Sequence, residues 1–339
     1  MIQETEEEVL CVRVPLRETE RVRRKLAAEG LLLPGRILRE GGHALIPVRE
    51  RVEGYPTVKA RVKLRRRLTL KEVLRGRLTE EELEQVKRSF DIVGDIAVVQ
   101  IPPELEHRRH EIGRALLEVQ PGIRVVLRKL GGVEGELRLR KLEHLAGERR
   151  TWTVHREHGV ELWVDLAKVY FSPRLAYERH RVMQQVAHGE VVVDMFAGAG
   201  GFALLIAKYR RARVLAIDLN ESAVECMRRS ISMNRLLGEV VPVHGDASRV
   251  TPEGVADRVI MNLPMGSDAF LETAFRAVRS RGVVHYYTAA PEGGAGEKMR
   301  VVEEAAESAG VEVEPLGVRR VRTYSPGTAH YVMDLLVRA

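Results

Sequence analysis

VVVDMFAGAGG, residues 191–201, is the stretch that decides the fold of this chain. A run of valines leads to Asp194 and then to a glycine-rich bend, which is typical of a buried parallel strand followed by the loop before a helix. Gly198 and Gly200 let the backbone turn tightly and approach a ligand, and the helix that starts near Phe202 would point its free amide groups at that ligand. The stretch therefore predicts a site for a nucleotide-like cofactor.

Two acidic residues at downstream strand ends also fit the binding of a nucleotide-like cofactor. Asp218 ends the apolar run RVLAI at a distance typical of a carboxylate that holds ribose hydroxyls, and Asp246 in HGDAS would face an adenine amine. Gly198, Gly200 and Ala203 also satisfy the G-x-G-x-x-A pattern of dinucleotide-binding loops. The sequence thus predicts an adenosine-containing cofactor, and both NAD and S-adenosylmethionine fit at this point.

The end of a fourth strand distinguishes between NAD and S-adenosylmethionine as the expected cofactor. The strand ADRVIM is followed by the amide side chain of Asn262 and the rigid Pro264 in MNLP. Such a turn places an amide and backbone carbonyls where they can hold a flat heterocycle beside a transferable methyl group, whereas hydride transfer needs neither. The pattern favours S-adenosylmethionine.

The pattern of strands and helices after residue 191 predicts an α/β fold. Expected strands alternate with helices through GVVHYYTA at residues 282–289, and the tail at residues 318–337 resembles two strands joined by Ser-Pro-Gly. We expect a doubly wound, mostly parallel, Rossmann-like sheet with a terminal antiparallel hairpin. Ligands bind such sheets at the carboxyl ends of the strands, where Gly198, Asp218 and Asn262 fall.

Two smaller α+β modules are expected before this domain. Residues 1–67 form the first module, residues 68–165 form a linker helix and a β-rich module, and residues 166–339 form the cofactor-binding domain. The strand VKARVKLRRRL in the first module carries basic residues with no acidic one among them. Alternation places Lys59, Arg61, Lys63 and Arg65 on one face, which is either a track for phosphates or an ordinary solvated face.

Composition limits the class of protein. The 339 residues carry a net charge of +7, which favours a polyanionic partner, although a charge-rich thermophile surface has a similar composition. We expect a cytoplasmic protein without a membrane partner, because no apolar run of about eighteen residues is present and the acidic N-terminus does not resemble a signal peptide. The spacing of Cys11 and Cys226 indicates neither a disulfide framework nor a metal site.

The motifs resemble one family over essentially the whole chain. DMFAGAGGF, AIDLN, HGDAS and ADRVIMNLP, with KVYFSPRL and SFDIVGDIAVVQIP upstream, are similar to the archaeal and eukaryotic tRNA (guanine-N1)-methyltransferases, which modify guanosine at tRNA position 37. Gly201 stands where that family usually has proline, and Met265 and Gly266 stand where Lys-Ser is common. The resemblance implies tRNA as the partner, S-adenosylmethionine as the methyl donor, and a first module that touches the tRNA elbow. We expect a monomer.

The resemblance also implies roles for particular residues. Glu178 is expected to be the general base that removes the guanine N1 proton, and Arg138 and Asn262 are expected to stabilise the charge that develops on O6, with Pro264 beside them. The residues expected to hold the cofactor are Arg179, Asp194, Phe196, Gly198, Gly200, Asp218, Leu219, Asp246, Ala247 and Asn262. Those expected to contact RNA are Lys63, Arg65, Arg66, Arg67 and Arg138.

Other activities on the same fold stay open. Related wybutosine-pathway enzymes transfer an aminocarboxypropyl group from the same cofactor or methylate a wyosine precursor, and Asn262 with Pro264 speaks against the aminocarboxypropyl reaction. A uridine C5 methyltransferase needs a cysteine at a strand end, and the chain has none there. An NAD oxidoreductase and a catalytically silent RNA-binding protein are further alternatives.

Overall fold

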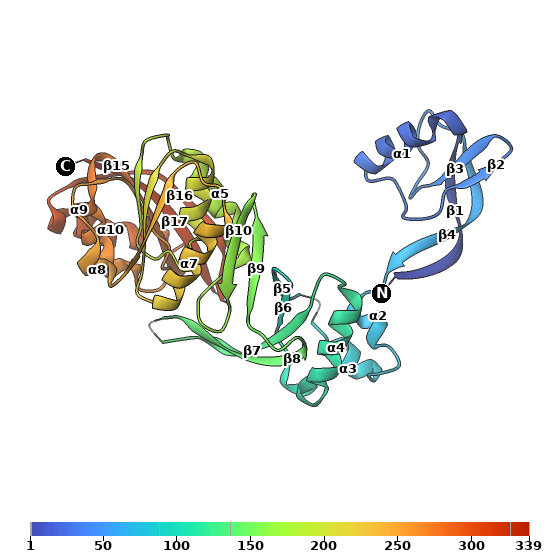
Figure 1. The fold of residues 1–339 in the computed structure, drawn as a ribbon, viewed down its shortest axis with the longest axis horizontal. Helices are drawn as coiled ribbons and strands as arrows, with labels where there is room; N and C mark the ends of the chain where they lie inside the picture. The colour runs from blue at the N-terminus through green and yellow to red at the C-terminus, as the bar shows by residue number, and fades with distance from the viewer. Residues whose placement is uncertain (1, 88, 136, 326, 339) are drawn as a thin grey trace. The chain divides into compact units, whose positions relative to one another are not determined.

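The computed structural model describes residues 2–87, 89–135, 137–325 and 327–338 (Figure 1). The chain forms two compact units, one from residues 1–88 and 101–122 and the other from residues 89–100 and 123–339. The three-module division expected at residues 67 and 165 stays a prediction. Among the described residues, no helix is long and apolar enough to cross a membrane.

The first unit contains a four-stranded antiparallel sheet and a helix. The strand order is β2-β3-β1-β4, and α1 covers the sheet (Figure 1). These elements are β1 Ile2–Pro15, α1 Thr19–Ala28, β2 Leu38–Glu40, β3 His43–Pro47 and β4 Thr57–Arg67. Val12, Leu26 and Ile46 are buried between them, since alternation along the strands directs one apolar face toward the amphipathic helix.

The strand β4 carries the basic residues singled out in the sequence, and its partner carries acidic ones. The register places Glu8 opposite Arg61 and Glu6 opposite Lys63 in the pairing of β1 with β4. Directly paired residues share a face of the sheet, so these carboxylates offset much of the positive charge that β4 alone suggests. The side chains of Arg65, Arg66 and Arg67 lie outside the described residues, and RNA contact by this strand stays a prediction.

The remainder of the first unit is helical. The linker helix expected at the start of residues 68–165 is divided into two short helices, because Gly76 adopts a left-handed φ of 81° between them. Thr79 and Glu82 form a capping box at the start of the second of these helices. The helices are α2 Leu70–Leu74, α3 Glu80–Gln85, the 3-10 helix η2 Pro103–Arg108 and α4 Arg109–Val119.

Two small sheets open the second unit. One has the order β5-β6-β7-β8 and the other pairs β9 with β10. Their strands are β5 Asp91–Val93, β6 Ile96–Val99, β7 Val125–Glu134, β8 Leu139–Gly147, β9 Trp152–Glu157 and β10 Val160–Asp165. The segment DIVGDIAVVQIP contains the antiparallel pair β5 and β6. The loop between β7 and β8 carries Arg138.

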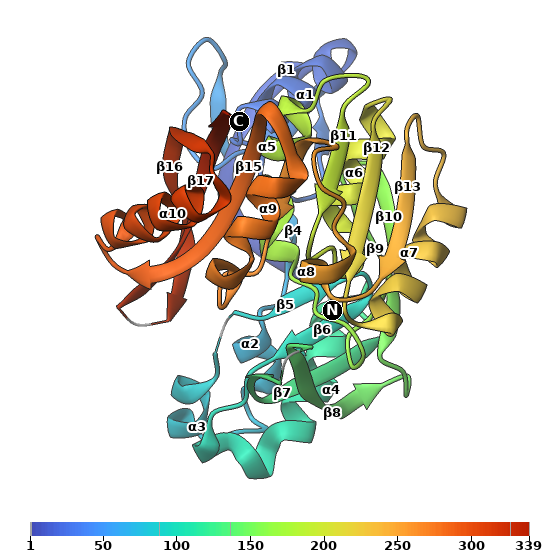
Figure 2. The same cartoon turned by 90° about the vertical axis from the view of Figure 1, so that its left-hand side faces the viewer.

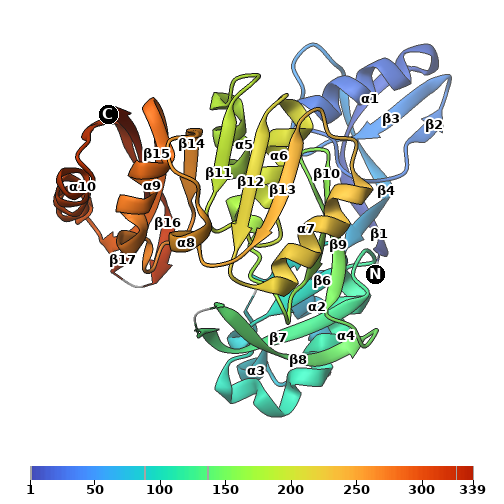
Figure 3. The same ribbon diagram turned by 60° about the vertical axis from the view of Figure 1, so that its left-hand side comes forward.

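A seven-stranded sheet forms the rest of the second unit and confirms the expected fold class. Its order is β13-β12-β11-β14-β15-β17-β16, with the first five strands parallel and β15, β17 and β16 antiparallel to one another (Figures 2 and 3). The strands are β11 Val191–Asp194, β12 Arg213–Asp218, β13 Glu239–His244, β14 Ala256–Met261, β15 Val278–Pro291, β16 Glu312–Ser325 and β17 Thr328–Arg338.

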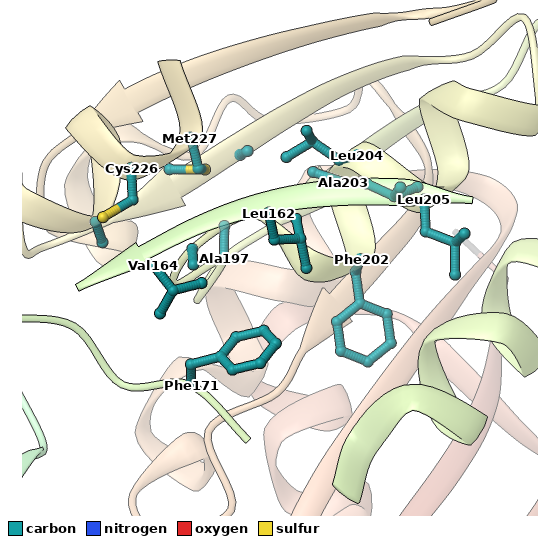
Figure 4. Packing of buried hydrophobic residues seen from close by; sticks show 14 of the residues in the cluster. Leu162, Val164, Phe171, Ala197, Phe202, Ala203, Leu204, Leu205, Cys226 and Met227 are labelled. Atoms are coloured by element: carbon teal, nitrogen blue, oxygen red, sulfur yellow. The ribbon is translucent and has the colours of Figure 1, made fainter. Parts of the chain in front are cut away.

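Helices cover both faces of this sheet. One apolar cluster joins α5, α6 and α7 to one face, and another joins α9 and α10 to the opposite face. The helices are α5 Ala176–Gln185, α6 Gly201–Tyr209, α7 Glu221–Met233, α8 Ala247–Val250, α9 Leu271–Ala277 and α10 Ala295–Ala309. Leu162 and Val164 of β10 point toward the rings of Phe171 and Phe202, so β10 completes the first cluster (Figure 4).

Candidate active site

A cavity of about 730 Å³ lies at the carboxyl ends of the parallel strands. This volume suits a cofactor-sized ligand. The sequence-predicted residues in its wall are Arg138, Phe196, Gly198, Asp218, Leu219, Asp246, Ala247, Asn262 and Pro264. Of the described residues predicted for catalysis or cofactor binding, Glu178, Arg179, Asp194 and Gly200 are not among the wall residues.

The glycine-rich loop between β11 and α6 is fixed by Asp218. The Gly198 N–H donates to one carboxylate oxygen of Asp218 at 2.7 Å, and the Asn220 N–H donates to the other at 2.8 Å. Gly198 and Gly200 adopt left-handed φ values of 54° and 83°, and a β-carbon on Gly200 would lie 2.4 Å from Leu204. Burial raises the pKa of Asp218, although the two backbone donors act against that shift.

Asp194 ends β11 directly beneath this loop. Its side chain is fully buried, and burial, aided by the nearby Asp218 carboxylate, raises the pKa of Asp194 to about 8. A neutral carboxyl group at this position adds no second full charge beside Asp218. Direct contact of Asp194 with a cofactor stays a prediction.

The third strand end presents Asp246 to the cavity. Asp246 caps the short helix α8 by accepting from the Ser248 N–H at 2.9 Å and from the Ser248 hydroxyl at 2.8 Å. These hydrogen bonds hold the pKa of Asp246 below its usual value. The carboxylate is therefore ionised and fixed in place, with the Ala247 amide beside it.

The fourth strand end brings Asn262 and Pro264 together at the cavity wall. The Pro264 carbonyl accepts from the Ala289 N–H at 2.9 Å, which ties the MNLP turn to β15. The Oδ1 atom of Asn262 is buried and has no hydrogen-bond partner among the described residues. A buried amide oxygen of this kind indicates a missing donor, which a ligand would supply.

Arg138 reaches the cavity from the β7–β8 loop. Its guanidinium lies 5.9 Å from the centre of the Tyr170 ring, and the Arg140 guanidinium lies 5.5 Å from the same centre. Arg138 also donates to the Met265 carbonyl at 3.5 Å, near the outer limit for a hydrogen bond. Arg322 donates to the Tyr170 hydroxyl at 3.5 Å, so cationic groups surround this ring at the cavity.

Glu178 and Arg179 lie on α5 and are both buried. The Glu178 carboxylate accepts from the Tyr287 hydroxyl and from Arg181, each at 3.1 Å, and pairs with Arg319. Arg179 donates two hydrogen bonds to Glu157. It also packs against Gly201, since a β-carbon added to Gly201 would lie 2.7 Å from the Arg179 Cδ atom. Arg179 thus supports the loop from behind in this structure, and its cofactor contact stays a prediction.

Arg322 and His330 are among the cavity residues that were not predicted from the sequence. Both lie on the terminal hairpin, which we expected only as an edge of the sheet. His330 is fully buried, and its two ring nitrogens have no partner among the described residues. Burial and then the charges of Arg322 and Arg138 lower the pKa of His330 to about 3. A histidine in an edge hairpin gives no local signal of such a position.

Three family models match the chain in succession. They are the tRNA methyltransferase 5 N-terminal domain at residues 11–56, the TYW2 N-terminal domain at residues 70–151 and the TRM5/TYW2 methyltransferase domain at residues 153–314. Together they span both units of the chain, and the third contains most of the cavity wall described above.

The names of two curated relatives describe different reactions on tRNA. The tRNA (guanine(37)-N(1))-methyltransferase Trm5b of Pyrococcus abyssi is 43% identical over 97% of this chain and 99% of its own length. The tRNA(Phe) (4-demethylwyosine(37)-C(7)) aminocarboxypropyltransferase of Pyrococcus horikoshii is 32% identical over 79% of this chain and 96% of its own length.

Solved structures with bound molecules have the same fold. The complex of aTrm5 with tRNALeu matches with a TM-score of 0.72 and 34% identity over 96% of this chain and 99% of that one. Methanocaldococcus jannaschii Trm5 in complex with adenosine matches with a TM-score of 0.67 and 32% identity over 97% of this chain and 99% of that one.

Proposed function

Because the chain belongs to the TRM5/TYW2 methyltransferase family, we propose that it transfers a methyl group from S-adenosylmethionine to N1 of guanosine 37 in tRNA. The observation that carries the proposal is the cavity in which Arg138, Asn262 and Pro264 meet Asp218 and Asp246 at the strand ends. Hydrogen-bond donors for a purine edge thus face the same cavity as acceptors for a nucleoside.

The extent of the relationship favours N1 methylation over aminocarboxypropyl transfer. The match to the P. abyssi N1-methyltransferase is both closer and longer, at 43% over 97% of the chain against 32% over 79% for the aminocarboxypropyltransferase. Residues 11–56 also match the N-terminal domain of tRNA methyltransferase 5. Methylation of a wyosine precursor is the second candidate function, because enzymes for this reaction and for N1 methylation share a family and a cofactor.

The cavity residues fit S-adenosylmethionine. Asp218 and Asp246 lie in the cavity wall, and both oxygens of Asp218 accept from backbone donors. In this proposal Asp218 accepts from the ribose hydroxyls and Asp246 accepts from the adenine amine. The rings of Phe196 and Phe270, with centres 5.0 Å apart, give the wall an apolar side. When bound, the cofactor supplies an electrophilic methyl group on a sulfonium.

The protein must position the guanine and accommodate a shift of charge. A base near the anticodon must leave its stack to enter a cavity, and guanine N1 must lose its proton as the methyl group is transferred. Negative charge then develops on O6. Arg138 and the Asn262 amide donate to O6 in this proposal, and they stabilise charge that grows in the transition state.

Glu178 is the general base that accepts the N1 proton in this proposal. It accepts hydrogen bonds from Tyr287 and Arg181 and pairs with Arg319, and these contacts fix the carboxylate in place. Its burial keeps bulk water away from the carboxylate. The basic residues Lys63 and Arg65–Arg67 of the first unit would act on the RNA backbone as positioning contacts.

A matched pair of variants tests this assignment. Glu178→Gln should lower the single-turnover rate of methyl transfer by about 10²- to 10⁴-fold while leaving cofactor and tRNA affinity within about twofold of wild type. Glu190→Gln removes another carboxylate that pairs with an arginine, Arg258, outside the cavity wall, and should leave the rate unchanged. A Glu178→Gln enzyme with the wild-type rate would remove Glu178 from the reaction.

A further inference from the structure

The first turn of α5 carries an exposed aromatic ring next to Glu178. Tyr177 directly precedes Glu178 in the chain and is 69% exposed, whereas the Glu178 side chain is 3% exposed. Among the large apolar residues that the structure describes, Tyr177 has the largest exposed fraction. A single exposed ring needs no explanation by itself, so its surroundings decide whether it has a function.

The surroundings of Tyr177 hold its ring in a defined orientation. The guanidinium of Arg319 lies 5.4 Å from the centre of the ring. Arg319 is itself held by an ion pair with Glu178, whose carboxylate also accepts from Arg181 and Tyr287. A fixed cation beside the ring restricts its movement, while most of the ring surface stays open to a partner.

Tyr177 and Arg319 lie at the rim of the cavity. Leu175 is part of the cavity wall and comes two residues before Tyr177. Arg322 is also part of the wall, and Arg319 and Arg322 stand opposite residues of β17 that are two positions apart. The two arginines therefore share a face of the sheet and are about 7 Å apart along it. The ring and the guanidinium thus reach the surface one step from the cavity on two separate elements.

The charge of this rim favours RNA as its partner. Residues 318–325 of β16 contain Arg319, Arg320 and Arg322 and no acidic residue, and β16 is the outermost strand of the sheet. Arg319 pairs with Glu178 and Arg320 pairs with Glu292, but both arginine side chains remain more than a third exposed, at 39% and 51%. Exposed guanidinium groups bind phosphates, and an exposed aromatic ring stacks on an unpaired base.

We propose that Tyr177 is a stacking platform for a base that flanks guanosine 37 in the bound tRNA. This inference rests on the proposed function. When guanosine 37 leaves its stack and enters the cavity, each neighbouring base loses a stacking partner. A neighbour at the cavity rim recovers a partner on the Tyr177 ring, and the tRNA is held with its target base in the cavity. Tyr177 therefore acts by binding RNA and takes no part in methyl transfer.

Two substitutions at Tyr177 separate stacking from chemistry. Tyr177→Ala should weaken tRNA binding by about tenfold, and Tyr177→Phe should bind as tightly as wild type because phenylalanine keeps the stacking ring. At saturating tRNA, the single-turnover rate of methyl transfer should stay within about threefold of wild type in both variants. A ring that served only to fix Arg319 and Glu178 would instead show its loss in that rate.

The fluorescence of 2-aminopurine measures the stacking itself, because this base is quenched when it stacks. One tRNA carries it at position 36 and a second tRNA carries it at position 38. In complexes with wild type and Tyr177→Phe, one of these two positions should stay quenched. In the complex with Tyr177→Ala, the same position should brighten by about twofold or more, because its base then has no ring to cover it.

Tyr209→Ala is the matched control. Tyr209 is also an exposed tyrosine, at 39%, but its hydroxyl donates to the His158 carbonyl at 2.9 Å, and among the described residues it is not part of the cavity wall. This variant should bind and quench as wild type does. Equal fluorescence of wild type and Tyr177→Ala at both positions would overturn the platform and leave the proposed function intact. Absence of methyl transfer by the wild-type enzyme would overturn the proposed function and the platform together.

Discussion

Replacing Asp218 by Asn tests the cofactor side of the cavity. The carboxylate accepts backbone N–H groups from Gly198 at 2.7 Å and Asn220 at 2.8 Å. An asparagine side chain has one oxygen and one NH₂ group, so one of the two backbone donors then faces another donor. Loss of one hydrogen bond to a charged group costs about 1.5–3 kcal/mol.

Part of this loss in folding free energy is offset at Asp194. The Asp218 charge adds to the raised pKa of Asp194, and removing that charge relieves the buried carboxyl group. We therefore expect the free energy of unfolding to fall by about 1–2 kcal/mol. Cofactor affinity should fall by about 10- to 100-fold, which corresponds to 1.4–2.8 kcal/mol, because the ribose hydroxyls lose a charged acceptor.

Titration calorimetry with S-adenosylhomocysteine measures this effect directly. Asp257→Asn is the control, because Asp257 also accepts a backbone N–H, from Val191 at 2.7 Å, but is absent from the cavity wall. The control should lose stability without losing cofactor affinity. Equal affinity in wild type and Asp218→Asn would refute the placement of the ribose beside Asp218.

Three further predictions follow from the site and the first unit. Asn262→Ala should slow single-turnover transfer by about 10- to 100-fold because a donor to O6 is lost, and a normal rate would exclude Asn262 from the reaction. Burial raises the pKa of Asp194 from 3.8 to about 8, so its protonated form stabilises the fold below pH 4 and this stabilisation is lost as the pH rises toward 8. The thermal midpoint of Asp194→Asn relative to wild type should therefore increase between pH 5 and pH 8, and a difference independent of pH would contradict the shift. Removal of residues 1–67 should weaken tRNA binding by about tenfold or more, measured by filter binding, while the rate within the assembled complex changes little, and unchanged affinity would assign that segment another role.

Local sequence patterns predicted the fold because each strand end carries its own signal. A valine run before Asp194, the glycines of the loop and the Asn-Leu-Pro turn are all short-range features, and each lies where a parallel sheet gathers its carboxyl ends. The expected alternation of strands and helices therefore brings Asp218, Asp246 and Asn262 to one cavity.

Features set by distant pairing could not be predicted in the same way. The acidic stripe of β1 opposite Lys63 depends on a register between strands more than fifty residues apart. His330 and Arg322 reach the cavity only because β17 pairs with both β15 and β16. The surroundings of Glu178 likewise depend on Tyr287 of β15 and Arg319 of β16, which are 109 and 141 residues away in the sequence.

Mass spectrometry of nucleosides from tRNA incubated with the protein and isotopically labelled S-adenosylmethionine tests the central claim most directly. The proposed function predicts one labelled methyl group on N1 of guanosine, at position 37, and none when that guanosine is replaced by adenosine. A labelled aminocarboxypropyl group, or label on any other base or atom, would contradict it.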